Sequence, residues 1–149
     1  MRACIQRVGK ARVTVAGQVC GQIAEGLLVL LGVGEEDREE DIHWMAKKIV
    51  HLRIFPDAVG QMNRSVLEVD GQLLIVSQFT LYGNCRKGRR PSFVEAATPE
   101  QAEAYYDRLV TLAVAEGASV ATGKFRAEME VELINTGPVT IWIDSKSDR

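Results

Sequence analysis

Leu27-Leu28-Val29-Leu30-Leu31, bracketed by Gly26 and Gly32, is the stretch that decides the predicted fold. It is the longest apolar run in the chain. A short run that is apolar at every position is typical of a central strand buried on both faces. It is also far shorter than the roughly 20 residues that a membrane-spanning helix needs. We therefore expect a buried sheet and no membrane partner.

Strand-like segments lie on both sides of this run. Three precede it, at residues 4–8, 12–16 and 19–23, and the strongest in the chain, Gln72 to Leu81, follows the Asp70-Gly71 turn signal. Near the C-terminus, Met129, Val131 and Leu133 alternate with glutamates, which is typical of a strand with one solvent face.

Two amphipathic helices are predicted between the strands. Asp37 followed by Glu40 resembles a capping box at the start of the first helix. Thr98 and Pro99 suit the N-cap and first position of the second, and Gly117 is expected to end it. The apolar residues recur at helical spacing: Ile42, Met45, Ala46, Ile49 and Val50 in the first, and Ala102, Tyr105, Tyr106, Leu109, Leu112 and Ala113 in the second.

Composition bounds the class of protein. The 149 residues suffice for one domain with its own core, so we expect a single compact α/β domain over residues 1–149, with two helices covering a mixed sheet. A net charge of −2 means that any contact with nucleic acid depends on a local basic patch. The three cysteines show no paired spacing and the N-terminal residues are too polar for a signal peptide, so we expect reduced thiols in a cytoplasmic protein.

The segment Asn135-Thr136-Gly137-Pro138-Val139-Thr140 has two interpretations. Local chemistry favours a hairpin turn between strands 129–134 and 139–143, because Asn and Gly adopt unusual backbone angles and Pro fixes its own φ. If the Gly137-Pro138 bond is cis, its two carbonyls can instead point the same way as a rigid backbone clamp. Local sequence leaves both open.

Three further features carry possible chemistry. Ser77-Gln78-Phe79-Thr80 suits an ordinary strand end, or an exposed Phe that stacks a base beside amide groups that stabilise an oxyanion. Arg7 lies within a strand and is expected to face solvent unless carbonyls or an anion lie beside it. The only concentrated basic segment is either a solvated loop or a phosphate contact, with equal support: Arg86, Lys87, Arg89 and Arg90.

The chain lacks the sequence motifs of several enzyme classes. The chain has no GxSxG, no HExxH, no Gly-rich phosphate loop and no paired carboxylates at a site spacing, so we predict neither a metal nor a cofactor. His43 and His51 lie on or just past the first helix and are interpreted as surface residues. A Ser-His-Asp hydrolase is therefore not expected.

The two motifs at residues 77–80 and 135–140, at this separation, resemble the signature motifs of the D-aminoacyl-tRNA deacylases. The resemblance extends from residue 1 to about residue 143, through Ile5-Gln6-Arg7-Val8, the strand at 27–33, Arg53-Ile54-Phe55 and Arg90-Pro91-Ser92-Phe93. It implies a three-layer β/β/α homodimer that hydrolyses the ester of D-aminoacyl-tRNA, and of glycyl-tRNA, as chirality proofreading.

The resemblance also implies a site at the dimer interface. Gly137 and Pro138, joined by a cis bond, would enter the partner's pocket and reject L side chains by steric exclusion. Ser77, Gln78 and Phe79 would bind the substrate, with Phe79 and its neighbours holding the terminal adenosine of the tRNA. The amides of Phe79 and Thr80 would face the ester carbonyl, and Arg7 would fix the Gly-Pro loop by donating to backbone carbonyls.

The mechanism expected for such a site is assisted by the RNA. Thr80 is a candidate nucleophile, but the motifs supply no base for its hydroxyl. An aminoacyl ester is already activated, so positioning and an oxyanion hole suffice, with the ribose 2′-hydroxyl or a water completing the reaction. Two alternatives stay open: a related deacylase acting on L-alanyl-tRNA, and a non-catalytic RNA-binding or dimerisation domain.

Overall fold

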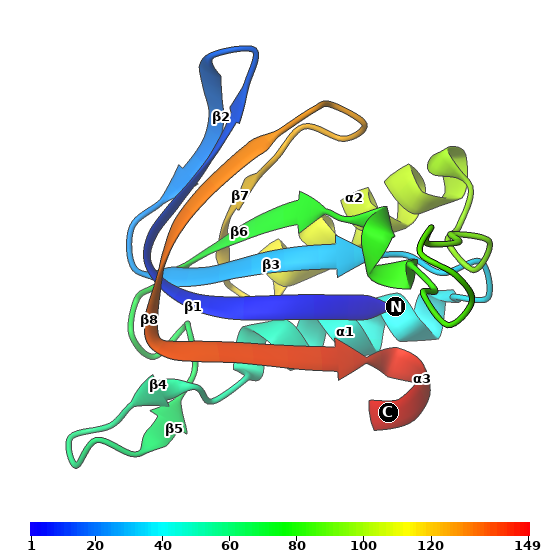
Figure 1. The fold of residues 1–149 in the computed structure, drawn as a ribbon. Coiled ribbons are helices and arrows are strands. Elements are labelled where there is room, and N and C mark those ends of the chain that lie inside the picture. Colours follow the sequence, from blue (N-terminus) through cyan, green and yellow to red (C-terminus); the bar gives the residue numbers. More distant parts are fainter.

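Six strands form one mixed sheet in the computed structural model, which describes residues 1–149 (Figure 1). Along the chain the strands are β1 (Arg2–Val15), β2 (Gln18–Ile23), β3 (Gly26–Gly32), β4 (Phe55–Pro56), β5 (Met62–Arg64), β6 (Gln72–Ser77), β7 (Ser119–Thr122) and β8 (Glu130–Asp144). The helices are α1 (Glu39–His51), the 3₁₀ helix η1 (Phe79–Tyr82), α2 (Pro99–Ala115) and α3 (Ser145–Asp148). The pair β4 and β5 forms a separate small hairpin.

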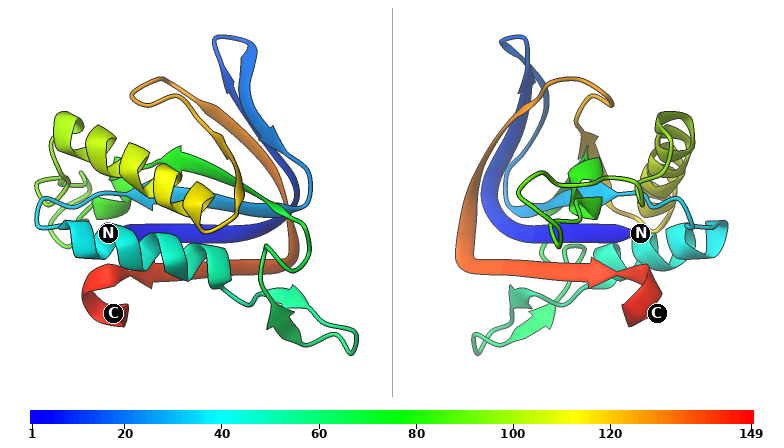
Figure 2. Two further views of the ribbon diagram at one scale, coloured as in Figure 1. Left: turned by 180° about the vertical axis from the view of Figure 1, so that it is seen from behind. Right: turned by 45° about the vertical axis from the view of Figure 1, so that its right-hand side comes forward.

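The long strand β1 organises the sheet. β8 runs antiparallel to one edge of β1 along almost its whole length, whereas the other edge pairs first with β3 and then with β2. β6 adds parallel to β3, and β7 adds parallel to β6. Both β1 and β8 bend sharply, so that the sheet curls over itself while α1 and α2 cover one face (Figure 2).

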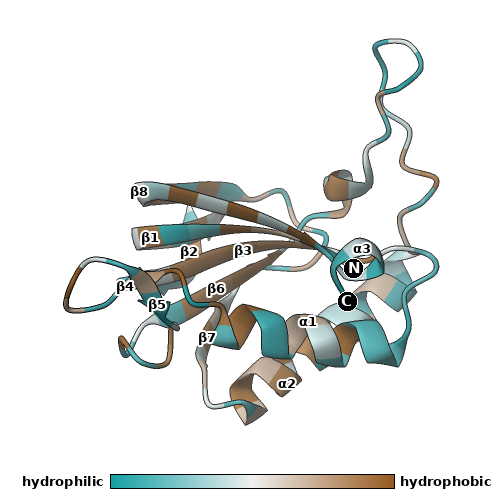
Figure 3. Ribbon diagram, turned by 90° about the horizontal axis from the view of Figure 1, so that it is seen from below, coloured by the Kyte–Doolittle hydropathy of each residue, from teal (hydrophilic) through white to brown (hydrophobic).

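This curl explains why β3 is apolar on both faces. Leu27, Val29 and Leu31 belong to the main core between the sheet and the helices. Leu28 faces a second, smaller core, formed inside the curl with residues of β1, β2 and β6. The prediction of a central buried strand is confirmed. The expected β/β/α layering comes from one bent sheet (Figure 2), and not from two separate sheets, with α1 and α2 against one face of it (Figure 3).

The prediction of a hairpin turn at residues 135–140 is wrong. β8 continues through this segment and pairs with β1 on both sides of it, with Thr140 opposite Gln6 and Asn135 opposite Val8. Residues 136–139 therefore stand opposite the single residue Arg7, as a bulge in one long strand. Turn-forming residues produced a bulge because β1 is long enough to pair with both halves.

Two element boundaries also differ from the prediction. The strongest strand ends at Ser77 instead of Leu81, because the chain turns into η1. α1 is capped by Arg38, whose amide donates to the Asp41 carboxylate at 2.9 Å. Asp37, predicted to be the cap, instead accepts from the Met1 amino group at 2.6 Å. The second helix begins as predicted, with the Thr98 hydroxyl accepting from an amide of the first turn.

Three predictions about the chain as a whole can be compared with this fold. All three cysteines are free thiols. No helix is long and apolar enough to cross a membrane. The prediction of one α/β domain with two helices on a mixed sheet is confirmed.

Candidate active site

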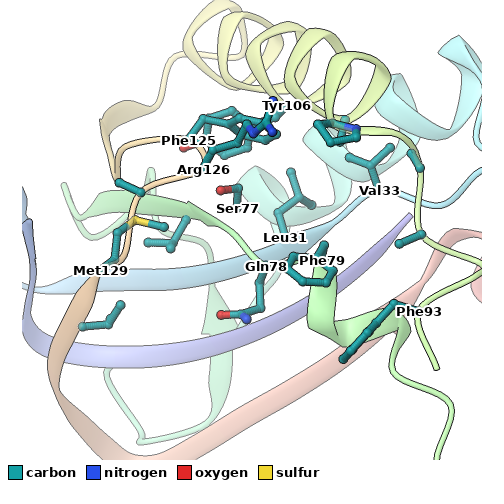
Figure 4. A pocket seen from close by; sticks show the side chains of 17 residues that line it. Leu31, Val33, Ser77, Gln78, Phe79, Phe93, Tyr106, Phe125, Arg126 and Met129 are labelled. Atoms are coloured by element: carbon teal, nitrogen blue, oxygen red, sulfur yellow. The ribbon is translucent and has the colours of Figure 1, made fainter. Parts of the chain in front are cut away.

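A cavity of about 600 Å³ opens where β3 and β6 end (Figure 4). The start of α2 closes one side, and the loop that leads into β8 closes another. Thirteen of its 17 lining residues are hydrophobic, which suits a flat, weakly polar ligand such as a nucleobase. Three of the predicted substrate-binding residues line it: Ser77, Gln78 and Phe79.

The segment from Ser77 to Thr80 is positioned by the sheet and by η1. Ser77 ends β6, and the backbone amide of Gln78 donates to the carbonyl of Leu31 at 2.7 Å, which ties the turn to β3. Phe79 then begins η1 at the mouth of the cavity, where the residue is 57% exposed. Its ring meets that of Phe93 edge to face, with 5.1 Å between the centroids.

The start of η1 offers donors to a ligand. The first amide groups of a helix have no acceptor within that helix, so the amides of Phe79 and Thr80 are available to an oxygen in front of them. The Thr80 hydroxyl accepts a hydrogen bond from the side-chain amide of Gln78. Thr80 is exposed and is not among the residues that line the cavity. Its placement suits a supporting role better than attack on a bound ester.

Sequence reasoning missed most of the remaining lining residues. Tyr106 was predicted only as core, yet its ring reaches the cavity while its hydroxyl donates to the Ile75 carbonyl at 2.6 Å. Burial raises the pKa of this phenol, so it stays a neutral donor. The loop before β8 contributes more apolar lining, and no motif in the sequence indicates it: Phe125, Ala127 and Met129.

Ionisable groups are scarce in the cavity wall. Arg126 and Tyr106 are the only ones, so no carboxylate, imidazole or thiol lines the cavity. Arg126 adopts a left-handed backbone with φ of 61°, at the turn that leads the chain toward β8. The wall thus supplies a cation and backbone donors, and no side-chain general base.

The Gly137-Pro138 segment lies away from this cavity in the same chain. Both residues are exposed on the bend of β8, and their peptide bond is cis, as the resemblance implies (Figure 1). Neither lines the cavity. A single chain therefore does not bring the two motifs together.

Arg7 holds the Gly-Pro segment in place. Its Nε donates to the Thr136 carbonyl at 3.3 Å, and its Nη1 donates to the Ile54 carbonyl at 2.7 Å. A Cβ atom at Gly137, where φ is +117°, would lie 2.7 Å from Nη2 of Arg7. The guanidinium therefore packs against the loop and faces backbone carbonyls, which explains a charge within this strand.

The basic segment forms an exposed loop next to η1. Asn84 and Ser92 pair across its base through two backbone hydrogen bonds of 2.8 and 3.0 Å. None of its four basic side chains forms an ion pair: Arg86, Lys87, Arg89 and Arg90. The histidines instead lie on the surface as predicted, His43 beside Glu39 and His51 beside Glu116.

Comparison with known proteins identifies the family. A sequence profile described as D-Tyr-tRNA(Tyr) deacylase matches residues 4–144. The chain belongs to the D-Tyr-tRNA(Tyr) deacylase family. A D-aminoacyl-tRNA deacylase of Thermotoga petrophila is 55% identical over 145 residues, covering 97% of each chain. Another, of Desulfatibacillum aliphaticivorans, is 57% identical and covers 98% of this chain and all of its own.

Solved structures agree with the deacylase fold. A protein described as c-Myc DNA unwinding element binding protein superposes with a TM-score of 0.91 at 38% identity, over 97% of this chain and 98% of its own. A probable eukaryotic D-amino acid tRNA deacylase gives a TM-score of 0.83 at 20% identity, over 95% and 97%. The resemblance drawn from the two motifs is thus confirmed, and with it the prediction of a hydrolase.

Proposed function

We propose that this member of the deacylase family hydrolyses the ester bond of D-aminoacyl-tRNA, releasing tRNA and the D-amino acid, as a cytoplasmic homodimer. The observation that carries the proposal is the cavity beside η1, in which the family motif at 77–79 meets unpaired backbone amides. Relatives more than half identical over nearly the whole chain bear the name of this activity.

The cavity suits the 3′-terminal adenosine of a tRNA. Phe79 is exposed at the mouth, where a base can stack on it, and Phe93 supports its ring from the edge. The apolar wall behind them accepts the flat faces of a purine. A base in this position places the attached ester near the start of η1.

The chemistry that we propose needs no side-chain base. The amides of Phe79 and Thr80 stabilise the negative charge that develops on the carbonyl oxygen of the ester. A water or the ribose 2′-hydroxyl of the substrate acts as nucleophile, because the ester is activated and the cavity wall contains no general base. Thr80 accepts a hydrogen bond from the side chain of Gln78 and so helps to orient Gln78 toward the substrate. It forms no covalent intermediate.

Selection by handedness requires a second subunit. Gly137 and Pro138 lie exposed in the bulge of β8 and do not line the cavity of their own chain. In a dimer their carbonyls would meet the amino group of the substrate in the partner's cavity and occupy the space of an L side chain. D-residues and glycine, which lack a group in that direction, would enter.

The outer surface of β8 supports a dimer. β8 pairs with β1 alone, which leaves its other edge without a strand. Trp142 and Ile134 on this strand expose 51% and 52% of their surface, although both are large and apolar. A second copy that covers β8 would bury them and bring the Gly-Pro segment to its cavity.

The test is a paired time course of deacylation on one tRNA charged with D-tyrosine and with L-tyrosine. We expect rapid loss of the D-ester and an intact L-ester with the wild type. A Pro138→Ala variant should be slower on the D-ester, because its carbonyl clamp is less rigid. Hydrolysis of both esters at similar rates would refute the clamp, and preference for L-alanyl-tRNA would indicate the related L-specific activity.

A non-catalytic role is the second candidate. The structural relative at 38% identity is described as a DNA unwinding element binding protein, and the basic loop at 86–90 presents four unpaired cations. A binding module would retain tRNA and release no amino acid. Absence of turnover on every aminoacyl ester would favour this role.

A further inference from the structure

The C-terminal end of α1 carries a second concentration of positive charge, which the sequence analysis did not single out. We call it the α1 basic cluster: Lys47, Lys48, His51 and Arg53. With Trp44 and Leu52 these side chains line a surface hollow of about 420 Å³ that contains no acidic lining residue. All four basic side chains are exposed.

Most of the charge in this cluster is available to a partner. Lys47, Lys48 and Arg53 form no ion pair, whereas Glu116 lies 2.8 Å from His51. Glu68 lies near enough to Arg53 for their charges to interact. The Lys48 ammonium lies 5.4 Å from the centre of the Trp44 ring, which holds it against the hollow. Clustered cations next to a planar aromatic surface are suited to a nucleic-acid backbone.

The opposite end of α1 is acidic. Glu36, Glu39 and Glu40 lie at or before its first turn. The amide of Glu35 donates to the carbonyl of Glu95 at 3.0 Å, and Glu95 precedes Ala96 and Ala97 of the cavity wall. RNA leaving the cavity would be repelled on this side. The exposed cations without an ion pair in the loop at 86–90, and cations of another subunit, are therefore better placed to guide it.

The α1 basic cluster is fixed next to the Gly-Pro segment. Arg7 donates to the carbonyl of Thr136, which precedes Gly137, and to the carbonyl of Ile54, which follows Arg53. One guanidinium thus joins the two segments. Figure 1 shows the β4–β5 hairpin, the bend of β8 and the end of α1 that leads to the hairpin on the same side of the molecule.

We propose that the α1 basic cluster of each subunit binds the acceptor-stem phosphates of the tRNA whose 3′ end lies in the partner's cavity. The inference rests on the proposed function. When the Gly-Pro segment enters the partner's cavity, the α1 basic cluster next to it also comes close to the substrate. Each tRNA then contacts two subunits: one supplies the cavity and the loop at 86–90, and the other supplies the clamp and the α1 basic cluster.

Binding of uncharged tRNA tests the docking surface without any hydrolysis. The variant is K47Q/K48Q, and the matched control, R38Q/R149Q, removes two exposed charges near the acidic end of α1. We expect K47Q/K48Q to weaken binding about tenfold at about 100 mM salt and to reduce the slope of log affinity against log salt by about two. The control should bind as the wild type does.

Binding by K47Q/K48Q with wild-type affinity and salt dependence would overturn the proposal. The two proposals can also fail separately. If the wild type binds tRNA through the cluster and hydrolyses no aminoacyl ester, the proposed function is wrong and the surface stands. If hydrolysis is stereospecific and the cluster has no effect on binding, the surface is wrong and the function stands.

Mixed dimers with one working cavity test which subunit supplies the contact. One chain carries Phe79→Ala and still offers its Gly-Pro segment to the other chain, whose cavity is intact. Adding K47Q/K48Q to the Phe79→Ala chain should slow deacylation of D-tyrosyl-tRNA about tenfold at low substrate concentration. Adding it to the chain with the working cavity should change little. The reverse result would place the contact within one subunit and refute the proposal.

Discussion

Replacing Arg7 by Ala removes the support of the Gly-Pro segment and should affect stability and selectivity together. Arg7 is half-buried and donates to the carbonyls of Thr136 and Ile54 at 3.3 and 2.7 Å. A partly buried carbonyl left without its donor costs about 1 to 3 kcal/mol. Two such losses, softened by water that enters the space, give a destabilisation of about 2 to 4 kcal/mol. The loosened loop should also admit some L-substrate.

Urea unfolding at a fixed protein concentration, beside deacylation of D- and L-tyrosyl-tRNA, measures both effects. Arg7→Lys should recover part of the stability only, because one ammonium cannot donate to both carbonyls as a guanidinium fork does. Arg12→Ala is the matched control, since Arg12 lies on the same strand in an exposed ion pair with Glu132 that contributes little. Wild-type stability and selectivity in Arg7→Ala would refute the role given to this side chain.

Three further predictions concern the site and the core. Thr80→Ala should keep deacylation within about tenfold of the wild type, because its hydroxyl only accepts from Gln78; a loss of several orders of magnitude, or a trapped acyl-enzyme, would show covalent catalysis. Phe79→Ala should raise KM for D-tyrosyl-tRNA about 10-fold to 100-fold at nearly unchanged stability, since its exposed ring stacks the base. An unchanged KM would show that the base does not stack on this ring. Burial alone would raise the pKa of Asp41, but hydrogen bonds from Lys146, Ser145 and the Arg38 amide outweigh it and lower the pKa to about 2. Because this pKa is depressed in the folded state, its contribution of about 2 kcal/mol is complete above about pH 5 and is lost as the pH falls through about 2. Acid unfolding of Asp41→Asn should lack this component, and an identical pH profile would contradict the assignment.

The sequence predicted the elements and the motifs well where local chemistry decides them. The apolar run at 27–31 became the central strand because both of its faces meet a core. The N-cap at Thr98 and the end of α2 before Gly117 depend on groups a few residues apart, so local patterns suffice. The motif Ser77-Gln78-Phe79-Thr80 was placed correctly near the end of β6, but its last two residues belong to η1 and not to the strand.

Features that depend on residues far apart in the sequence could not be predicted from local patterns. The segment 135–140 has the composition of a turn, and only the pairing of β1 with both halves of β8 makes it a bulge. Asp37 has the residue type of a helix cap, but its carboxylate accepts a hydrogen bond from the amino group of Met1, which is distant in the sequence. Phe125 and Met129 line the cavity because a loop folds back over β6, which no spacing in the sequence reveals. In each case a distant partner overrides the local preference.

The measurement that tests the account most directly is complementation between two impaired chains. Gly137→Ala should displace the clamp, because φ is +117° there and the new Cβ would lie 2.7 Å from Nη2 of Arg7, whereas Phe79→Ala impairs the cavity. Each homodimer alone should deacylate D-tyrosyl-tRNA poorly. Random mixing makes half of the dimers mixed, each with one intact composite site, so about a quarter of the wild-type activity should return. Failure of the mixture to exceed its two components would contradict an active site built from two subunits.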